Sequence, residues 1–179
     1  VEYKGVHVLI EAFKNLLDNN PFIRLFIVGG YTHSNNIQTP YIVNLKKLAS
    51  RCADRITFTG YVDHKEIPVF LRFANVVVVP SLWEEPFGMV VIEAMALARC
   101  VVAFKKGGIK EIITNEKDGI LVNEATAEGL QRSLDMLVND VRMREKIGLK
   151  ARQLVEEKFS WSKISNDVAL IYSSLCPWR

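Results

Sequence analysis

The stretch that decides the fold is VVVVPSLWEEPFGMVVIEAMALARCVVAF, residues 76–104. It opens with the valine run Val76–Val79 and closes with a second apolar run, Cys100–Phe104. Short continuous runs rich in β-branched residues predict strands buried on both faces. Between the two runs, residues 88–97 have the length and composition of a helix. A strand, a helix and a second strand in this order predict a parallel βαβ unit.

The same alternation continues on both sides of this stretch. Strands are expected at 24–28, 55–59 and 119–122, with helical segments between them. The 179 residues are enough for one domain with a sizeable core. The sequence therefore predicts a doubly wound, Rossmann-like α/β domain over residues 1–179 that ends in a helical tail. In that tail an apolar stripe predicts packing on the domain itself; its members are Phe159, Trp161, Ile164, Val168 and Tyr172.

Composition excludes several classes of function. The formal net charge is +3 and the Lys and Arg residues are scattered, whereas nucleic-acid binding favours a basic stripe. No apolar run approaches the roughly 18–20 residues of a membrane span. The three cysteines, an odd number without metal-ligand spacing, predict free thiols in a reducing cytoplasm: Cys52, Cys100 and Cys176. The three histidines lack a partner at ligand spacing and predict no metal site, although His33 lies in a loop expected to face the ligand: His7, His33 and His64.

One ionisable residue stands out in the helix predicted at 88–97. Glu93 is its sole charged residue, and its neighbours are apolar on every side, which predicts a helix buried all round. A buried carboxylate costs several kcal/mol unless it is paired or hydrogen-bonded. Glu93 is therefore expected to meet either a polar group of the protein or the hydroxyls of a ligand.

The loop before this helix adds groups that suit a ligand. Glu85 precedes the helix, and Gly88 lacks a side chain where the backbone could approach a ligand closely. The amides of Phe87, Gly88 and Met89 at the helix N-terminus offer donors to an anion or a sugar oxygen. In a parallel α/β sheet, ligands bind at the carboxyl ends of the strands, where this loop lies. Amide donors flanked by two carboxylates suit a molecule with both phosphates and hydroxyls, such as a nucleotide-sugar.

Residues 85–96 also resemble a known motif. They are similar to the E-x7-E motif of the retaining, GT-B-fold glycosyltransferases of family 4. The resemblance extends over nearly the whole chain through five further segments: 3–13 with Lys4-Gly5, 58–62, 79–81, 107–112 and 118–122. It corresponds to the C-terminal, donor-binding half of such an enzyme, so we expect the acceptor-binding half to lie outside these residues.

The resemblance implies a role for each matching position. Glu85 would accept hydroxyls of the transferred sugar, and Glu93 would hold the ribose hydroxyls of the nucleotide. Lys4 would neutralise the diphosphate and stabilise it as the leaving group. Glu85 and Lys4 are thus the expected catalytic residues. The other expected donor contacts are Phe87, Gly88, Met89, Gly60, Tyr61 and Val62, with Gly29 and Gly30 either joining them or only forming a turn.

The implied activity is retaining transfer from a UDP-, GDP- or ADP-sugar to a glycan or lipid-linked acceptor, in surface polysaccharide or lipopolysaccharide biosynthesis. It would use no metal or other cofactor, in the cytoplasm or at the inner face of the membrane as a peripheral enzyme. These residues alone would bind a donor weakly and transfer no sugar. Two alternatives stay open: a GT-B sugar-nucleotide epimerase or phosphorylase, and a non-catalytic nucleotide-binding or coat-type interaction domain.

Two departures from the family pattern, and one family feature of the tail, lead to further expectations. The family's first strand and a phosphate-binding Arg or Lys would precede Val1. Ala98-Arg99-Cys100 stands where the family has Gly-x-Pro, so the turn after the motif helix is expected to be built differently. Finally, the helix at 159–179 would, in the family, cross back to brace the N-terminal half, an alternative to packing on this domain.

Overall fold

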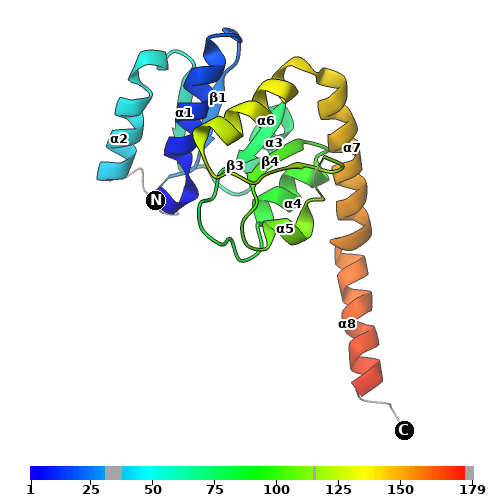
Figure 1. Cartoon of the computed structure of the whole chain (residues 1–179). Coiled ribbons are helices and arrows are strands. Elements are labelled where there is room, and N and C mark those ends of the chain that lie inside the picture. Colours follow the sequence, from blue (N-terminus) through cyan, green and yellow to red (C-terminus); the bar gives the residue numbers. More distant parts are fainter. Residues whose placement is uncertain (31–37, 115, 176–179) are drawn as a thin grey trace.

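The computed structural model describes residues 1–30, 38–114 and 116–175, so His33 and Cys176 lie outside the described residues. Strands and helices alternate along the chain as predicted (Figure 1). The elements are η1 (Glu2–Lys4), α1 (Val6–Leu17), β1 (Leu25–Val28), α2 (Pro40–Leu48), η2 (Ser50–Cys52), β2 (Ile56–Gly60), α3 (Ile67–Phe73), β3 (Val76–Val79), α4 (Met89–Ala96), β4 (Cys100–Phe104), α5 (Ile109–Ile112), β5 (Ile120–Val122), α6 (Ala127–Asn139), α7 (Val141–Lys158) and α8 (Trp161–Leu175).

The described strands form two parallel sheets. One pairs β1 with β2, and the other has the order β3-β4-β5, with Val76 opposite Cys100 and Val102 opposite Ile120. The predicted α/β class with parallel strands and a helical tail is confirmed. The sheet is nevertheless interrupted, because β1 and β3 do not pair with each other.

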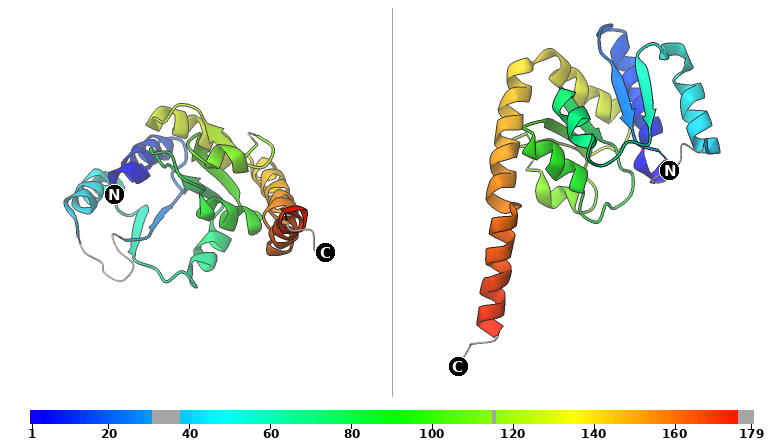
Figure 2. Two further views of the ribbon diagram at one scale, coloured as in Figure 1. Left: turned by 90° about the horizontal axis from the view of Figure 1, so that it is seen from below. Right: turned by 180° about the vertical axis from the view of Figure 1, so that it is seen from behind.

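Helices cover both faces of the β3-β4-β5 sheet (Figure 2). Alternate residues of β4 point to opposite faces, as a strand requires. Cys100, Val102 and Phe104 pack with α1 and α6 on one face, while Val101 and Ala103 pack with α4 and α7 on the other. All five β4 residues are buried, because β4 has a strand on each side and helices above and below. This sheet positions the loops of the candidate site at its carboxyl edge.

The prediction that the valine run is buried on both faces is wrong for Val76, Val77 and Val78. These residues are only partly buried, and Val79 alone is fully buried. The reason is the position of β3 in the sheet: it pairs with β4 on one side and with no described strand on the other. A run of four valines cannot distinguish an edge strand from a central one, since both favour β-branched residues.

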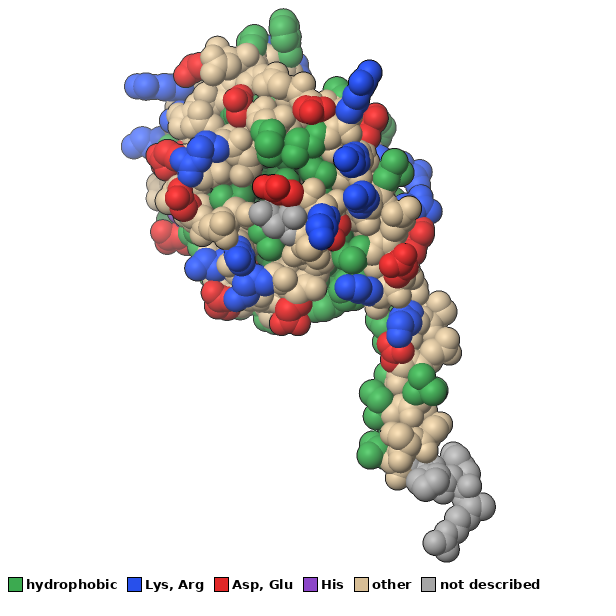
Figure 3. All heavy atoms as spheres, turned by 45° about the vertical axis from the view of Figure 1, so that its right-hand side comes forward, with side chains coloured by type: hydrophobic (Ala, Val, Ile, Leu, Met, Phe, Trp, Pro, Cys, Tyr) green, Lys and Arg blue, Asp and Glu red, His purple; other side chains and the backbone are tan. Residues whose placement is uncertain are grey.

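The tail does not pack on the domain as its apolar stripe predicted. Helix α8 continues away from the end of α7 as a rod (Figure 1), and none of its residues is buried. Trp161 is 86% exposed, and further apolar side chains line the projecting helix (Figure 3). Phe159, just before α8, packs on the domain, with its ring edge-on to Phe87 at 6.0 Å between centroids. That α8 braces an N-terminal half stays a prediction.

The turn after α4 keeps the left-handed conformation that the missing glycine would have supplied. Ala98 has φ 55°, and the amides of Ala98 and Arg99 donate to the carbonyls of Met95 and Ala94, which is the Schellman pattern. The expectation of a differently built turn is therefore wrong. Packing explains why the conformation persists: a Cβ at Gly148 of α7 would lie 2.1 Å from the Ala98 oxygen, so this helix sits directly against the turn.

Replacing Ala98 with glycine is expected to stabilise the protein by about 1 kcal/mol, because a left-handed conformation costs a non-glycine residue roughly 1–2 kcal/mol and part of that gain is lost to unfolded-chain entropy. The midpoint of urea unfolding would measure it. The matched control is Ala96→Gly, two residues earlier inside α4, where the same change should destabilise by about 0.5–1 kcal/mol. Equal losses for both variants would contradict the expectation.

Candidate functional site

The N-terminal turn and the loop after β3 meet at the carboxyl edge of the sheet. The Leu82 amide donates to the Tyr3 carbonyl at 2.8 Å, which fastens the two segments together. Gly5 has φ 67°, and a Cβ there would lie 1.9 Å from the Pro80 oxygen. The glycine next to Lys4 is thus required for contact with the protein's own backbone. This contact places Lys4 beside the E-x7-E loop.

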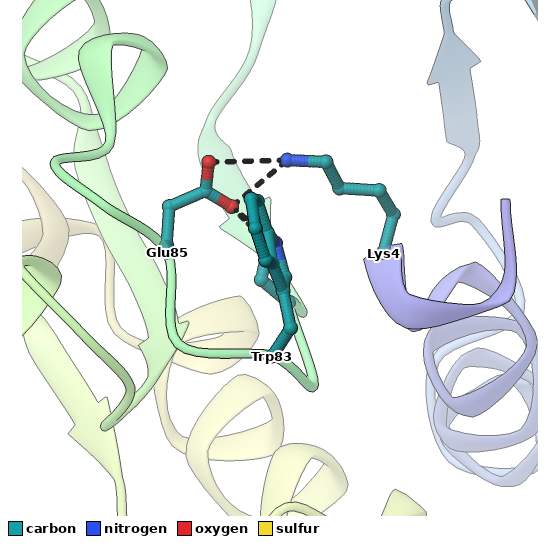
Figure 4. A network of polar contacts seen from close by, with 4 residues as sticks. Lys4, Trp83 and Glu85 are labelled. Atoms are coloured by element: carbon teal, nitrogen blue, oxygen red, sulfur yellow. Dashed lines mark hydrogen bonds and ion pairs between the residues drawn. The ribbon is translucent and has the colours of Figure 1, made fainter.

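Lys4 and Glu85 form an ion pair in which the ammonium contacts both carboxylate oxygens (Figure 4). The Lys4 Nζ lies 2.8 Å from Glu85 Oε2 and 3.1 Å from Oε1. Two further donors reach Oε2: the Ser81 hydroxyl at 3.0 Å and the Trp83 indole Nε1 at 2.9 Å. The two residues expected to be catalytic are therefore brought together from positions 81 apart in the sequence.

Two aromatic rings flank the ammonium group of Lys4. Its Nζ lies 5.1 Å from the centre of the Trp83 ring, within the range of a cation–π contact. The Tyr3 ring lies 5.1 Å from the Trp83 ring at an angle of 54°. Trp83 was not among the site residues expected from the sequence. Its indole N–H bond to Glu85 shows that it belongs to the site, and its position two residues before Glu85 was the signal available in the sequence.

Opposing effects act on the pKa of Glu85. Burial by itself raises this pKa, but the hydrogen bonds from Lys4, Ser81 and Trp83 and the positive charge of Lys4 together outweigh it. The net result is a pKa below the usual value of a glutamate. Glu85 is therefore a carboxylate at neutral pH, suited to accept hydrogen bonds from hydroxyls and unsuited to donate a proton.

The N-terminus of α4 leaves backbone donors available next to Glu85. In the described part of the chain, the amides of Phe87, Gly88 and Met89 donate no hydrogen bond. Gly88 is the N-cap with φ 99°, and a Cβ there would come within 3.1 Å of Ile109. Gly88 is therefore required by its left-handed backbone and by packing inside the protein, in addition to any ligand approach.

Glu93 has a protein partner, and its helix is not buried all round as predicted. Met89 and Val90 on α4 are exposed, with 59% of Met89 accessible, and the Glu93 side chain is partly exposed. Glu93 Oε1 lies 3.3 Å from His64 Nε2. Because His64 is itself largely exposed, this partner can move aside. Sequence reasoning missed His64. The signal available in the sequence was its position just after the expected donor contacts at residues 60–62.

The glycines at the ends of β1 and β2 lie against each other. The Gly29 amide donates to the Gly60 carbonyl at 3.0 Å, and a Cβ at Gly30 would lie 3.1 Å from the Tyr61 nitrogen. Among the described residues, a Cβ at Gly29 would meet nothing within 4 Å. Val62, next to Tyr61, is partly buried. The structure therefore groups these expected donor contacts at one end of the β1-β2 sheet, on the loop that leads to His64.

The loop after β4, which contains Gly107 and Gly108, is hydrogen-bonded to the E-x7-E loop. Glu84 Oε2 accepts a hydrogen bond of 2.5 Å from the Gly107 amide, and the Glu85 carbonyl accepts one of 2.7 Å from the Gly108 amide. The Lys106 Nζ lies 3.9 Å from Glu84 Oε1 and adds a positive charge beside this carboxylate, whereas Lys105 is exposed. The hydrogen bond from Gly107 is the main reason that the pKa of Glu84 is lowered. Sequence reasoning missed Glu84, because its partner lies 23 residues away.

Two kinds of feature are absent from residues 1–30, 38–114 and 116–175. No group of three or more His, Cys, Asp or Glu side chains there is placed to hold a metal ion. None of the helices found there is long and apolar enough to cross a bilayer.

The comparison with protein families is decisive for identity. The family described as glycosyl transferases group 1 matches residues 1–154, which include the Lys4 turn and the whole E-x7-E segment. The chain belongs to the glycosyl transferases group 1 family. This membership agrees with the resemblance carried by Glu85 to Glu93.

The relatives of this group 1 glycosyltransferase chain are longer proteins, and the chain aligns with about half of each. It is 28% identical over 171 residues to Spore coat protein SA of Bacillus subtilis, covering 94% of this chain and 45% of the relative. It is 31% identical over 169 residues to the lipopolysaccharide 1,2-N-acetylglucosaminetransferase of Salmonella typhimurium, covering 90% and 43%. The Anabaena protein HepE, solved in complex with UDP, superposes with a TM-score of 0.87 at 26% identity, covering 97% and 46%. The chain thus spans less than half the length of each.

Proposed function

We propose that these residues form the donor-binding half of a retaining glycosyltransferase that takes a sugar from a nucleoside diphosphate. The observation that carries the proposal is the meeting of Lys4 with Glu85 beside the unbonded amides of α4. A cation, a carboxylate and backbone donors at the carboxyl edge of a parallel sheet match the phosphates and hydroxyls of such a donor. The UDP held by HepE, a protein with a closely similar fold, supports the same ligand class.

In this proposal each group has one task. Lys4 binds the diphosphate, Glu85 accepts hydroxyls of the sugar, and Glu93 accepts the ribose hydroxyls after His64 moves aside. The amides at the start of α4 bind the sugar and the phosphate oxygens. The remaining donor contacts, at the nucleotide base and its surroundings, come from Gly60, Tyr61, Val62, Gly29 and Gly30.

The chemistry follows from where charge develops. The bond between the anomeric carbon and the diphosphate oxygen breaks, and the sugar passes through an oxocarbenium-like state. The acceptor hydroxyl adds on the same face, and its proton passes to the departing diphosphate oxygen. Negative charge accumulates on the departing diphosphate, where the ammonium of Lys4 and the amides of α4 stabilise it. No metal or other cofactor is required. The acceptor and the remaining groups would be supplied from outside these residues.

The acceptor that we propose is a glycan or a lipid-linked glycan of surface polysaccharide or lipopolysaccharide assembly, in the cytoplasm or at the inner membrane face. A relative named as a lipopolysaccharide glycosyltransferase supports this class. A second candidate is a non-catalytic coat-type interaction domain, which the relative named Spore coat protein SA favours. Under that second reading, Glu85→Gln and Glu93→Gln would leave the biological activity of the full-length protein intact.

Calorimetric titration of the full-length protein with UDP-, GDP- and ADP-sugars tests the proposal. At least one donor is expected to bind, and Glu93→Gln should weaken it roughly 10- to 100-fold, because hydrogen bonds to a charged group contribute about 1.5–3 kcal/mol. The matched control is Glu111→Gln on α5, an exposed carboxylate without a proposed role, which should change the Kd less than about twofold. The proposal fails if none of the three donors binds.

A further inference from the structure

The two oxygens of Glu85 have unequal partners. Oε2 accepts from Lys4, Ser81 and Trp83, which fills the acceptor capacity of one carboxylate oxygen. Oε1 accepts from Lys4 alone within the described residues. Departure of the Lys4 ammonium would therefore leave Oε2 held by two neutral donors and would leave Oε1 without a partner.

Lys4 is the partner that can leave. Its side chain is 42% exposed, whereas Glu85 is 15% exposed and Ser81 is 2% exposed. A donor diphosphate attracts the ammonium strongly, since it offers more negative charge than one carboxylate. The face of the Trp83 indole, 5.1 Å from Nζ, keeps the ammonium within reach of both anions during this exchange.

Ser81 and Trp83 are neutral donors, so a diphosphate attracts them less strongly than it attracts the Lys4 ammonium. Ser81 is buried just after the end of β3, and the Trp83 ring, although 37% exposed, contacts the ring of Tyr3. Their hydrogen bonds fix Oε2 and hence the direction of Oε1 after the exchange. A sugar hydroxyl arriving with the diphosphate then finds an oriented and partly desolvated acceptor, while a nucleotide without a sugar leaves that acceptor unsatisfied.

We propose that Trp83 and Ser81 are positioning residues that hold Glu85 through Oε2, so that transfer of Lys4 from Glu85 to the donor diphosphate opens Oε1 to a hydroxyl of the sugar. This inference rests on the proposed function and deepens it. It makes recognition of the sugar conditional on the diphosphate. A free sugar meets an Oε1 that Lys4 still occupies, and a nucleoside diphosphate alone gains nothing from Glu85.

The test compares two dissociation constants in the full-length protein: that of the nucleoside diphosphate and that of the matching nucleotide-sugar. Trp83→Phe keeps the ring beside Lys4 and Tyr3 but removes the N–H donor. We expect the ratio of the first constant to the second to fall about tenfold, with a smaller change in the Kd of the nucleoside diphosphate, because phenylalanine keeps a weaker contact with the Lys4 ammonium. Ser81→Ala should act in the same direction, and the double variant should abolish the preference for the sugar-bearing ligand.

The matched control is Trp161→Phe, the same exchange on the exposed helix α8, which should leave both constants unchanged. Equal weakening of both ligands by Trp83→Phe would indicate a merely structural role and overturn the inference, as would an unchanged ratio. Binding of neither ligand by the unaltered protein would instead overturn the proposed function, and the inference with it.

Discussion

Replacing Glu85 with glutamine is expected to lower kcat/KM for sugar transfer by the full-length protein roughly 100- to 1,000-fold, the scale of losing one polar group aimed at the reacting centre. The amide removes the charge opposite Lys4. It also turns one acceptor into an NH₂ group that faces the donors of Lys4, Ser81 and Trp83. The variant therefore loses both the ion pair and the acceptor for the sugar hydroxyl.

The neighbouring carboxylate supplies the control for this experiment. Glu84 faces the Gly107 amide, and glutamine at this position keeps an oxygen for that hydrogen bond, so Glu84→Gln should change kcat/KM only a few-fold. Urea unfolding of both variants would separate a loss of activity from a loss of fold. Equal rates for Glu85→Gln and the unaltered protein would refute a role for Glu85 in transfer.

Replacing Gly107 with alanine is expected to destabilise the protein by about 3 kcal/mol or more, combining backbone strain with overpacking. Gly107 has φ 49°, and its new Cβ would lie 2.1 Å from the Glu85 oxygen and 2.5 Å from the Glu85 nitrogen. Backbone atoms cannot yield as a flexible side chain can. The E-x7-E loop must therefore shift, and donor affinity should fall together with stability.

The control substitution is Gly29→Ala, which also lies at positive φ but whose new Cβ would meet no atom of the described residues within 4 Å. It isolates the backbone penalty from the clash and should cost only about 1–2 kcal/mol. Urea unfolding midpoints measure both variants. If Gly107→Ala costs no more than Gly29→Ala, the close approach of the two loops does not contribute to stability.

Sequence reasoning succeeded where one element carries the information. The order of strands and helices was readable because each buried element imposes its own periodicity on the chain. It failed to predict side-chain exposure, which depends on the elements that pack around a residue. Val76 belongs to a strand with a single described partner. Met89 lies on a helix face that no described element covers, and Trp161 lies on a helix that projects from the domain.

The expected site residues divide in the same way. Glu85 and Glu93 could be chosen from one segment, since the loop and the helix N-terminus are local features. The distant partners of Glu93 and Glu84 could not be chosen in this way. His64 is 29 residues from Glu93, and the Gly107 amide that binds Glu84 is 23 residues away. These distances in sequence carry no information until the order of strands within the sheets is known.

By itself, the sequence determined the α/β class, because short-range spacing follows directly from backbone geometry. The E-x7-E segment and the family followed from its resemblance to known glycosyltransferases. Only the tertiary structure decided that Lys4 occupies Glu85, that Ser81 and Trp83 hold the opposite oxygen, and that Gly5 is needed for Lys4 to arrive there. The physical reason is that contacts between loops depend on which strand ends are adjacent. That adjacency is set by long-range packing of the sheets and their helices.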